Sequence, residues 1–258
     1  MATLNSIRLK LVIAYDGRPF RGWQSQAGGN TVQDFLESAF AKICGGEGTR
    51  VHGAGRTDSG VHALAQCAHA DVARRTPIDW TGALNAHLPR EIRVLRCSPA
   101  RADFHARYSA KGKIYTYRIW NAPVLSPFEF GRVWHLPGDP LNFDALKNAA
   151  ALFVGTHDFA AFAANRGKPE SDTVRTISSL AVRRKTIAPA GQLITLVFKG
   201  DGFLYKMVRL LTGSLVRVEQ GKIEPQWISN MLDGPNERAA KSSFVAPAEG
   251  LYLTRVIY

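Results

Sequence analysis

The stretch Gly53-Ala54-Gly55-Arg56-Thr57-Asp58-Ser59-Gly60-Val61-His62 is the most informative part of this 258-residue sequence. Its glycines allow tight turns and a close approach of the backbone to a ligand. The stretch holds one carboxylate, Asp58, two residues from the guanidinium of Arg56. A cation that near favours the ionised acid. The pattern therefore predicts an ionised carboxylate on a tight loop, but spacing alone favours an ordinary surface Asp-Ser-Gly turn over a functional one.

Outside this loop, hydrophobic periodicity predicts alternating strands and helices. Residues 7–15 alternate between apolar and basic side chains, as in a half-buried strand. Asn30, with Gln33 three residues on, is the expected cap of a helix that ends at Gly45. Further strands are expected at 65–72, 92–98, 114–120, 180–184, 193–199 and 251–257. Further helices are expected from near Pro77, over 143–153, over about 203–218 and around 228–232.

The charge balance is unusual. Lys and Arg number 33 against 21 acidic residues, a formal net charge of +12. A surplus of this size favours a polyanionic partner, and no amphipathic basic helix directs it to a membrane, so nucleic acid is the better interpretation. A single basic cluster is usually a solvated face, but together they predict a phosphate-binding surface. The clusters are Arg74-Arg75, Arg90/Arg93/Arg96, Arg101/Arg107/Lys111/Lys113, Arg166/Lys168 and Arg183-Arg184-Lys185.

Cysteine usage and missing motifs argue against metals, cofactors and export. Cys44, Cys67 and Cys97 lie far apart and form no C-x-x-C pair, which favours a reduced compartment. No zinc-ligand spacing and no phosphate-cradling glycine motif is present, so we expect neither metal nor cofactor. The first residues lack an apolar signal core, and no stretch approaches membrane-spanning length, so a cytoplasmic protein is expected.

The glycine-rich loop resembles the catalytic motif of the tRNA pseudouridine synthase A family. Further blocks match this family in order along nearly the whole chain: residues 15–24, 103–117, 157–177, 202–213 and 248–253. Ser59, Ala70 and Glu219 depart from the usual pattern, at positions where alanine, an aromatic residue and glycine are common. None of these departures removes the carboxylate.

The resemblance implies a fold and a substrate. The expected fold is α/β (α+β), with two similar halves that each carry a largely antiparallel sheet and packed helices and that face a central basic cleft. The halves are expected at 1–108, which carries the catalytic loop, and at 109–258. The implied activity is an isomerase that converts uridines at positions 38–40 of the tRNA anticodon stem-loop to pseudouridine. The family also implies a homodimer in which one tRNA touches both subunits.

The chemistry of this reaction fits a single carboxylate. The bond between C1′ and N1 of uridine breaks, the base turns over, and C1′ joins C5, so the product is an isomer. The resemblance makes Asp58 the nucleophile, with attack on C1′ and attack on C6 both left open. A glycosidase would instead need two carboxylates flanking the sugar, and the motif offers no second acid.

Three further residues are assigned to substrate binding by the resemblance. Arg56 is implied to enter the space that the flipped base leaves, although a plain ion pair with Asp58 is compatible with this role. Tyr115 is implied to stack on the target uracil, whereas its strand pattern alone favours an aromatic core position, the role we assign to Tyr117. Arg209 is implied to pair with the catalytic Asp, and the alternative is a helix-flank position with the charge in water.

Two rival functions remain at this stage. One is a non-catalytic RNA-binding protein of the same fold, against which the intact Asp58, Arg56, Tyr115 and Arg209 argue. The other is a pseudouridine synthase for another RNA, because shape readout is spread over many weak contacts.

Overall fold

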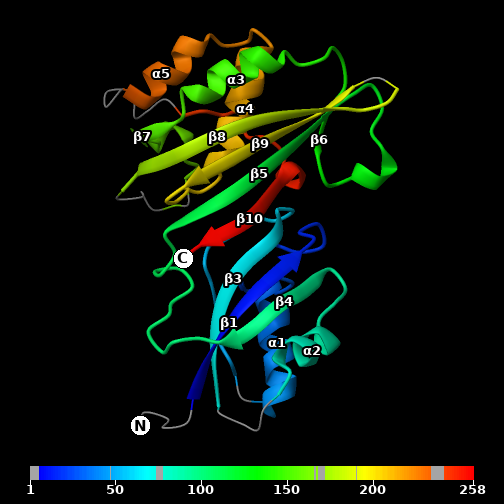
Figure 1. Ribbon diagram of the computed structural model, residues 1–258, viewed down its shortest axis with the longest axis vertical. Helices are drawn as coiled ribbons and strands as arrows, with labels where there is room; N and C mark the ends of the chain where they lie inside the picture. The colour runs from blue at the N-terminus through cyan, green and yellow to red at the C-terminus, as the bar shows by residue number, and fades with distance from the viewer. Residues whose placement is uncertain are drawn as a thin grey trace. The chain divides into compact units, whose positions relative to one another are not determined.

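The computed structural model describes residues 6–46, 48–73, 78–165, 167, 172–189, 191–233 and 241–258 (Figure 1). The chain forms two compact units. Unit 1 comprises Met1–Lys111 together with Tyr252–Tyr258, and unit 2 comprises Gly112–Leu251.

Unit 1 is built on a mostly antiparallel sheet. Its strands lie in the order β4 (Ile92–Pro99), β1 (Ser6–Tyr15), β3 (His62–Ala73) and β10 (Leu251–Ile257), with β2 (Val51–Gly53) also paired to β3. β1 is antiparallel to both β3 and β4, whereas β10 runs parallel to β3. Leu9, Leu11 and Ile13 of β1 are fully buried and alternate with partly exposed residues. The predicted half-buried strand is therefore confirmed, with its apolar side chains on one face.

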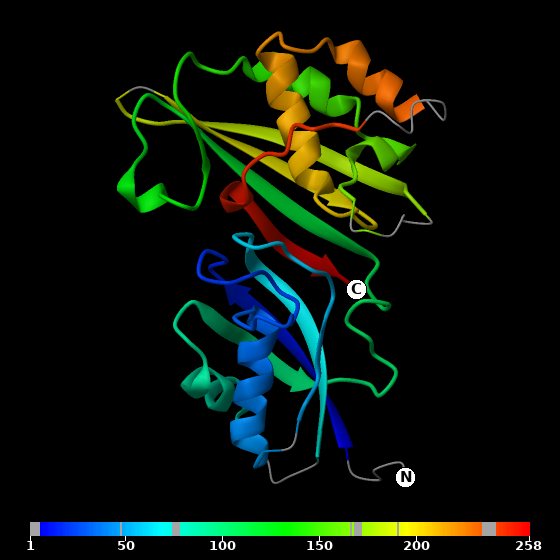
Figure 2. The same ribbon diagram turned by 180° about the vertical axis from the view of Figure 1, so that it is seen from behind.

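Two helices accompany this sheet, α1 (Val32–Cys44) and α2 (Trp80–His87), and α1 lies over the strands in Figure 2. The predicted cap of α1 is wrong by one residue. Thr31 is the N-cap and forms a capping box with Asp34, because Asn30 has a positive φ of 60° and turns the chain just before the helix. The predicted end is confirmed: Gly45 adopts the left-handed conformation at φ 76°.

Unit 2 carries an antiparallel sheet with helices on one face. The strands lie in the order β5 (Gly112–Asn121), β9 (Gln192–Gly200), β8 (Val174–Thr186) and β7 (Gly155–Asp158), and β6 (Trp134–Leu136) runs parallel to β5. The helices are α3 (Phe143–Ala151), α4 (Met207–Glu219) and α5 (Pro225–Asp233), seen in front in Figure 2. Short 3-10 turns occupy Pro127–Glu129, Ala160–Phe162 and Ala248–Gly250.

Two boundaries in unit 2 differ from the prediction. α4 begins at Met207 rather than near Phe203, because Lys206 has a positive φ of 58° that a helix cannot continue through. β8 begins at Val174, well before the expected residue 180, because its first residues pair with the short strand β7. Periodicity misses such a start, since the pairing partner lies elsewhere in the chain.

The two units confirm the mixed α/β class with mostly antiparallel strands. The last strand lies in unit 1, whereas the expected halves place it in the second, 109–258. Its parallel pairing of Tyr252 with His62 and of Leu253 with Ala63 accounts for this difference. The clusters Arg74-Arg75 and Arg166/Lys168, and the helix start expected near Pro77, lie outside the described residues.

Candidate active site

The glycine-rich loop of unit 1 is held by the segment that follows β1. Thr57, one residue before Asp58, is buried. Its hydroxyl is 2.8 Å from the hydroxyl of Tyr15, and its carbonyl accepts the N–H of Trp23 at 3.0 Å. A further bond closes the loop itself, from the N–H of Val61 to the carbonyl of Asp58 (3.1 Å). These bonds fix the backbone on both sides of the carboxylate.

Glycines make this close packing possible. A Cβ on Gly17 would lie 2.1 Å from the carbonyl oxygen of Val61, and one on Gly53 would lie 2.5 Å from the indole of Trp23. Gly22 combines a positive φ of 87° with a Cβ position 2.6 Å from the carbonyl oxygen of Thr57. At Gly17 and Gly22 no L side chain fits without a shift of the backbone, so the two segments contact each other backbone to backbone there. At Gly53 the backbone contacts the indole ring of Trp23.

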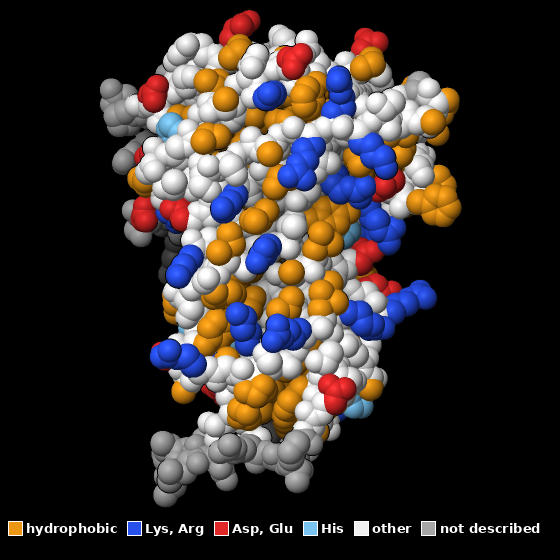
Figure 3. All heavy atoms as spheres, in the orientation of Figure 1, with side chains coloured by type: hydrophobic (Ala, Val, Ile, Leu, Met, Phe, Trp, Pro, Cys, Tyr) orange, Lys and Arg blue, Asp and Glu red, His pale blue; other side chains and the backbone are white. Residues whose placement is uncertain are grey.

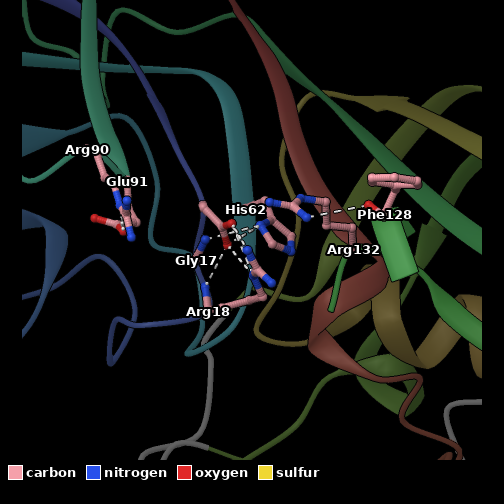
Figure 4. Close-up of polar contacts among 8 residues, drawn as sticks. Gly17, Arg18, His62, Arg90, Glu91, Phe128 and Arg132 are labelled. Atoms are coloured by element: carbon pink, nitrogen blue, oxygen red, sulfur yellow. Dashed lines mark hydrogen bonds and ion pairs between the residues drawn. The ribbon is translucent and has the colours of Figure 1, made fainter. Parts of the chain in front are cut away.

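A polar cluster at the end of β1 supports the same loop (Figure 4). Nδ1 of His62 accepts the N–H of Gly17 at 3.1 Å and lies 3.3 Å from Oδ1 of Asp16. Because Nδ1 accepts this bond, Arg18 is the cation that balances the carboxylate, through contacts of 2.6 to 3.0 Å. Burial would raise the pKa of Asp16, but the hydrogen bonds from Arg18 outweigh it and hold the pKa below its usual value.

His62 is itself fixed on its ring face. It is 2% exposed and stacks on Tyr252 of β10 with ring centroids 4.6 Å apart and planes inclined by 18°. The last residue of the motif is thus locked between β10 and the turn after β1. This function of Asp16 and His62 was not predicted from the sequence. A signal was present, since Asp-Gly directly after a buried strand and a His at the end of the motif both needed polar partners.

Asp58 and Arg56 occupy the stiff loop but differ in exposure. Asp58 is half-buried, whereas the side chain of Arg56 is exposed. A carboxylate held this way loses little conformational freedom when a substrate binds, which suits a group that must attack or stabilise one atom. The neighbouring Ser59, which departs from the usual alanine, donates its hydroxyl to the carbonyl of Phe20 at 3.1 Å and adds one more anchor.

The other two assigned residues lie in unit 2. Tyr115 on β5 is 8% exposed and packs edge-on against Phe203, with centroids 5.1 Å apart. Tyr117 is fully buried, and its hydroxyl donates to the carbonyl of Pro247 at 2.7 Å. The core role predicted for Tyr117 is therefore confirmed. Its burial raises the pKa well above the usual value for tyrosine.

Arg209 stands at the start of α4 and joins that helix to the segment before β10. Its Nε donates to the carbonyl of Ala246 at 2.7 Å, and its own carbonyl accepts the N–H of Ala246 at 3.1 Å. The side chain is partly buried. This partial exposure is compatible with both the ion pair and the helix-flank position considered for Arg209. At the other end of α4, Glu219, another departure from the family pattern, accepts the N–H of Asn142 at 2.7 Å and connects α4 with the start of α3.

Lys and Arg side chains are spread over the face of each unit seen in Figure 3. In unit 2, Arg183, Arg184 and Lys185 of β8 are all exposed. Arg184 lies over the ring of Phe143 at 5.0 Å, while Arg183 and Lys185 point to the opposite face of the strand.

Among the described residues, no group of three or more His, Cys, Asp or Glu side chains is placed to hold a metal ion. In the same part of the chain, no helix is long and apolar enough to cross a membrane.

Comparison with known proteins identifies the family. A family model described as tRNA pseudouridine synthase matches residues 11–109 and 149–258. The chain is 48% identical to tRNA pseudouridine synthase A of Akkermansia muciniphila, over 97% of this chain and 95% of that protein. It is 45% identical to the protein of the same name from Solidesulfovibrio magneticus, over 97% and 91%. With that of Methylacidiphilum infernorum the identity is 41%, over 96% and 94%.

The fold and the matched segments define an RNA-modifying isomerase. The chain belongs to the tRNA pseudouridine synthase family. It isomerises uridine in tRNA to pseudouridine.

Proposed function

We propose that Asp58 is the nucleophile and that the substrate uridines lie at positions 38–40 of the anticodon stem-loop. The observation that carries the proposal is the fixation of the loop around this carboxylate. Thr57 is bonded to Tyr15 and Trp23, and Val61 is bonded back to Asp58 itself. A carboxylate held this way meets the one catalytic demand that an isomerisation at C1′ makes of a side chain.

The other assigned residues complete the proposal. Arg56, exposed on the same loop, fills the space that the flipped uridine leaves in the stem, because extrusion of a base sacrifices stacking that the protein must replace. Tyr115 stacks on the target uracil, supported from its edge by Phe203. Arg209 pairs with the catalytic carboxylate, and its bond to the Ala246 carbonyl fixes the direction of the guanidinium.

The proposal extends to assembly and location. The protein acts in the cytoplasm as a homodimer, with tRNA contacting both subunits and without metal or cofactor. The net charge of +12 supports a polyanionic substrate. Light scattering gives the mass of the assembly. An assay in excess EDTA, with tRNA folding checked in parallel, tests metal independence: a loss that one divalent ion reverses contradicts it.

The decisive experiment incubates the purified protein with unmodified tRNA and maps pseudouridine at nucleotide resolution. We expect product at positions 38–40, and none with Asp58→Asn. Product at other positions only, or in another RNA only, supports the rival synthase. Tight tRNA binding without any product supports the non-catalytic alternative.

A further inference from the structure

The segment between β4 and β5 presents one tyrosine to solvent. The side chain of Tyr108 is 77% exposed. One face of its ring stacks on His105, with centroids 4.3 Å apart and planes inclined by 28°. The guanidinium carbon of Arg107 lies 5.8 Å from the centre of the same ring. Solvent exposure of a large aromatic ring is common, but an exposed ring that is stacked on one side and flanked by a cation is a specific arrangement.

The turn that carries this pair is closed by its own hydrogen bonds. Nδ1 of His105 accepts the backbone N–H groups of Arg107 (3.1 Å) and Tyr108 (3.2 Å). Ser109 adds two more bonds. Its N–H donates to the carbonyl of His105 (2.9 Å), and its hydroxyl accepts the N–H of His105 (3.0 Å). The exposed ring is therefore held in place before any ligand arrives.

The stack continues inward to the sheet of unit 1. His105 contacts His69 edge-on at 4.6 Å, and His69 stacks on His52 at 5.0 Å. His69 is 3% exposed, and its Nδ1 accepts the N–H of Ala106 at 3.1 Å. Burial, together with the neighbouring side chains His52, Arg8 and Arg107, lowers the pKa of His105, which favours the neutral ring that accepts these bonds. Tyr108 thus stands at the outer end of a supported column of rings.

The chemistry around this column matches an unpaired nucleotide. The open face of a tyrosine ring stacks on any nucleobase, and a neighbouring guanidinium binds the adjoining phosphate. Arg107 and Lys111 are both exposed beside it. The nearby acid Asp103 is bonded to Arg101 at 2.9 Å, so its charge is balanced. Recognition of RNA commonly uses unpaired bases stacked on aromatic side chains in this way.

We propose that Tyr108, stacked on His105, is a platform for an unpaired nucleobase of the tRNA, with Arg107 on the adjoining phosphate. This proposal rests on the tRNA substrate. The nucleobase is not the reacting uridine. Asp58 is bonded to Val61, next to His62 at the start of β3, whereas His69, which contacts His105 under the platform, lies seven residues further along that strand, about 23 Å at the usual rise of a strand.

The test measures tRNA affinity in an Asp58→Asn background, where no turnover interferes. Tyr108→Ala should weaken binding about tenfold, whereas Tyr108→Phe, which keeps the stacking face, should stay within about twofold. The salt dependence should keep its slope in Tyr108→Ala and flatten in Arg107→Gln, because only the phosphate contact releases counterions. In the enzyme with Asp58 intact, Tyr108→Ala should raise KM and change kcat little. Phe128→Ala, at an 86% exposed aromatic of unit 2, is the matched control and should change none of these.

A second readout locates the nucleobase. Chemical probing should show one unpaired base of the tRNA that the Asp58→Asn protein protects and the Asp58→Asn/Tyr108→Ala protein does not. Unchanged affinity in Tyr108→Ala overturns the proposal, as does an equal reduction in Tyr108→Phe. A change in the mass of the assembly that accounts for the weaker binding also overturns it, because Tyr108 is then a protein contact. If the protein binds tRNA with this pattern but forms no pseudouridine, the platform stands and the proposed function fails.

Discussion

The same short pattern, a strand followed by Asp-Gly and then an aromatic residue, occurs once in each unit. In unit 1 Asp16-Gly17 follows β1, and in unit 2 Asp201-Gly202 follows β9. Gly17 contacts the glycine-rich loop so closely that a Cβ would lie 2.1 Å from a backbone oxygen of Val61. A Cβ on Gly202 would lie 3.3 Å from its nearest neighbour, an atom in the side chain of Arg175.

The carboxylates of Asp16 and Asp201 differ in the same way, because only the first lies beside the glycine-rich loop. Asp16 is bonded to Arg18 and lies beside His62 of the motif, so it supports the loop. Asp201 accepts the N–H groups of Thr176 (3.1 Å) and Gly202 (2.6 Å), so it closes the end of the β8–β9 pair. A local pattern thus predicts a turn in both places, but the segment packed against the turn decides whether it supports the glycine-rich loop or only the fold.

The largest effect that this comparison predicts is at the loop itself. Asp58→Asn keeps the shape of the side chain and removes its charge, so we expect turnover to fall at least about a thousandfold while tRNA binding survives. Single-turnover rates and equilibrium binding on the same tRNA measure both quantities. Residual activity within tenfold of the unmodified protein would contradict the nucleophile role, and a parallel decrease in binding would indicate a structural loop.

The two glycines offer a direct test of the difference between the turns. Gly17→Ala forces a methyl group against backbone, so it should cost about 3 kcal/mol of unfolding free energy and most of the activity. Gly202→Ala meets only a flexible arginine and should cost about 1 kcal/mol or less. Urea denaturation and single-turnover assays give both numbers. Equal costs in the two variants would mean that the turns are equivalent.

The units should also respond differently to acid. Burial, together with the neighbouring side chains His105, Arg8 and His52, lowers the pKa of His69 from 6.5 to about 4. The unfolded chain takes up this proton near pH 6.5 and the folded protein only near pH 4. Protonation of His69 therefore leaves the free energy of unfolding unchanged above about pH 6.5. The free energy of unfolding decreases as the pH falls from about 6.5 to about 4, and it levels off below that. At pH 5 the decrease is about 2 kcal/mol.

Hydrogen exchange of peptides from β3 and β9 at pH 7 and pH 5 checks this prediction. Peptides of β3 should lose more protection than those of β9, and His69→Gln should reduce the difference. His87→Gln, at an exposed position of the same unit, is the control and should leave it unchanged. An identical response of the two strands in the unmodified protein would exclude His69 as the cause.

The smallest expected effects concern basic side chains, some of which should affect tRNA affinity and others turnover. Replacing Arg183 and Lys185 of unit 2 by Ala should flatten the dependence of tRNA affinity on salt, by about one unit of slope for each phosphate that is no longer bound. The rate on saturating tRNA should change little. Arg56→Ala in unit 1 should do the reverse, with an unchanged slope and turnover about tenfold lower, because base extrusion loses support. If Arg56→Ala alters affinity alone, Arg56 is a further phosphate-binding residue.

Much of the fold could be predicted from the sequence, because its signals are local. Alternation along residues 7–15 predicts β1, and Gly45 marks the end of α1. The strands β2, β6 and β7 were missed, since three or four residues give no periodicity and each depends on a distant partner. The assignment of β10 to unit 1 was missed for the same reason.

In the candidate site, too, local features could be predicted from the sequence and contacts between distant residues could not. The glycine-rich motif itself identifies Asp58 and Arg56 as candidates, because their residue types and spacing stand in one short stretch. Sequence could not show that Thr57 is bonded to Tyr15, since 42 residues separate them. Nor could it show that His62 rests on Tyr252, or that His52, His69 and His105 form one column. These contacts exist only once β2, β3 and β10 have paired.

The place of β10 in the chain bears on how the protein is made. Unit 1 contains the glycine-rich loop, but its strand β10 comes after unit 2 in the sequence. The ring that covers His62 comes from this strand, and Tyr258, the residue after it, donates its hydroxyl to the carbonyl of Ala106 at 2.7 Å. During translation, unit 1 therefore stays one strand short until unit 2 has left the ribosome, while unit 2 already has its whole sequence. A nascent chain that stalls just before residue 252 has the whole sequence of unit 2 but lacks the strand that covers His62 at the end of the glycine-rich loop.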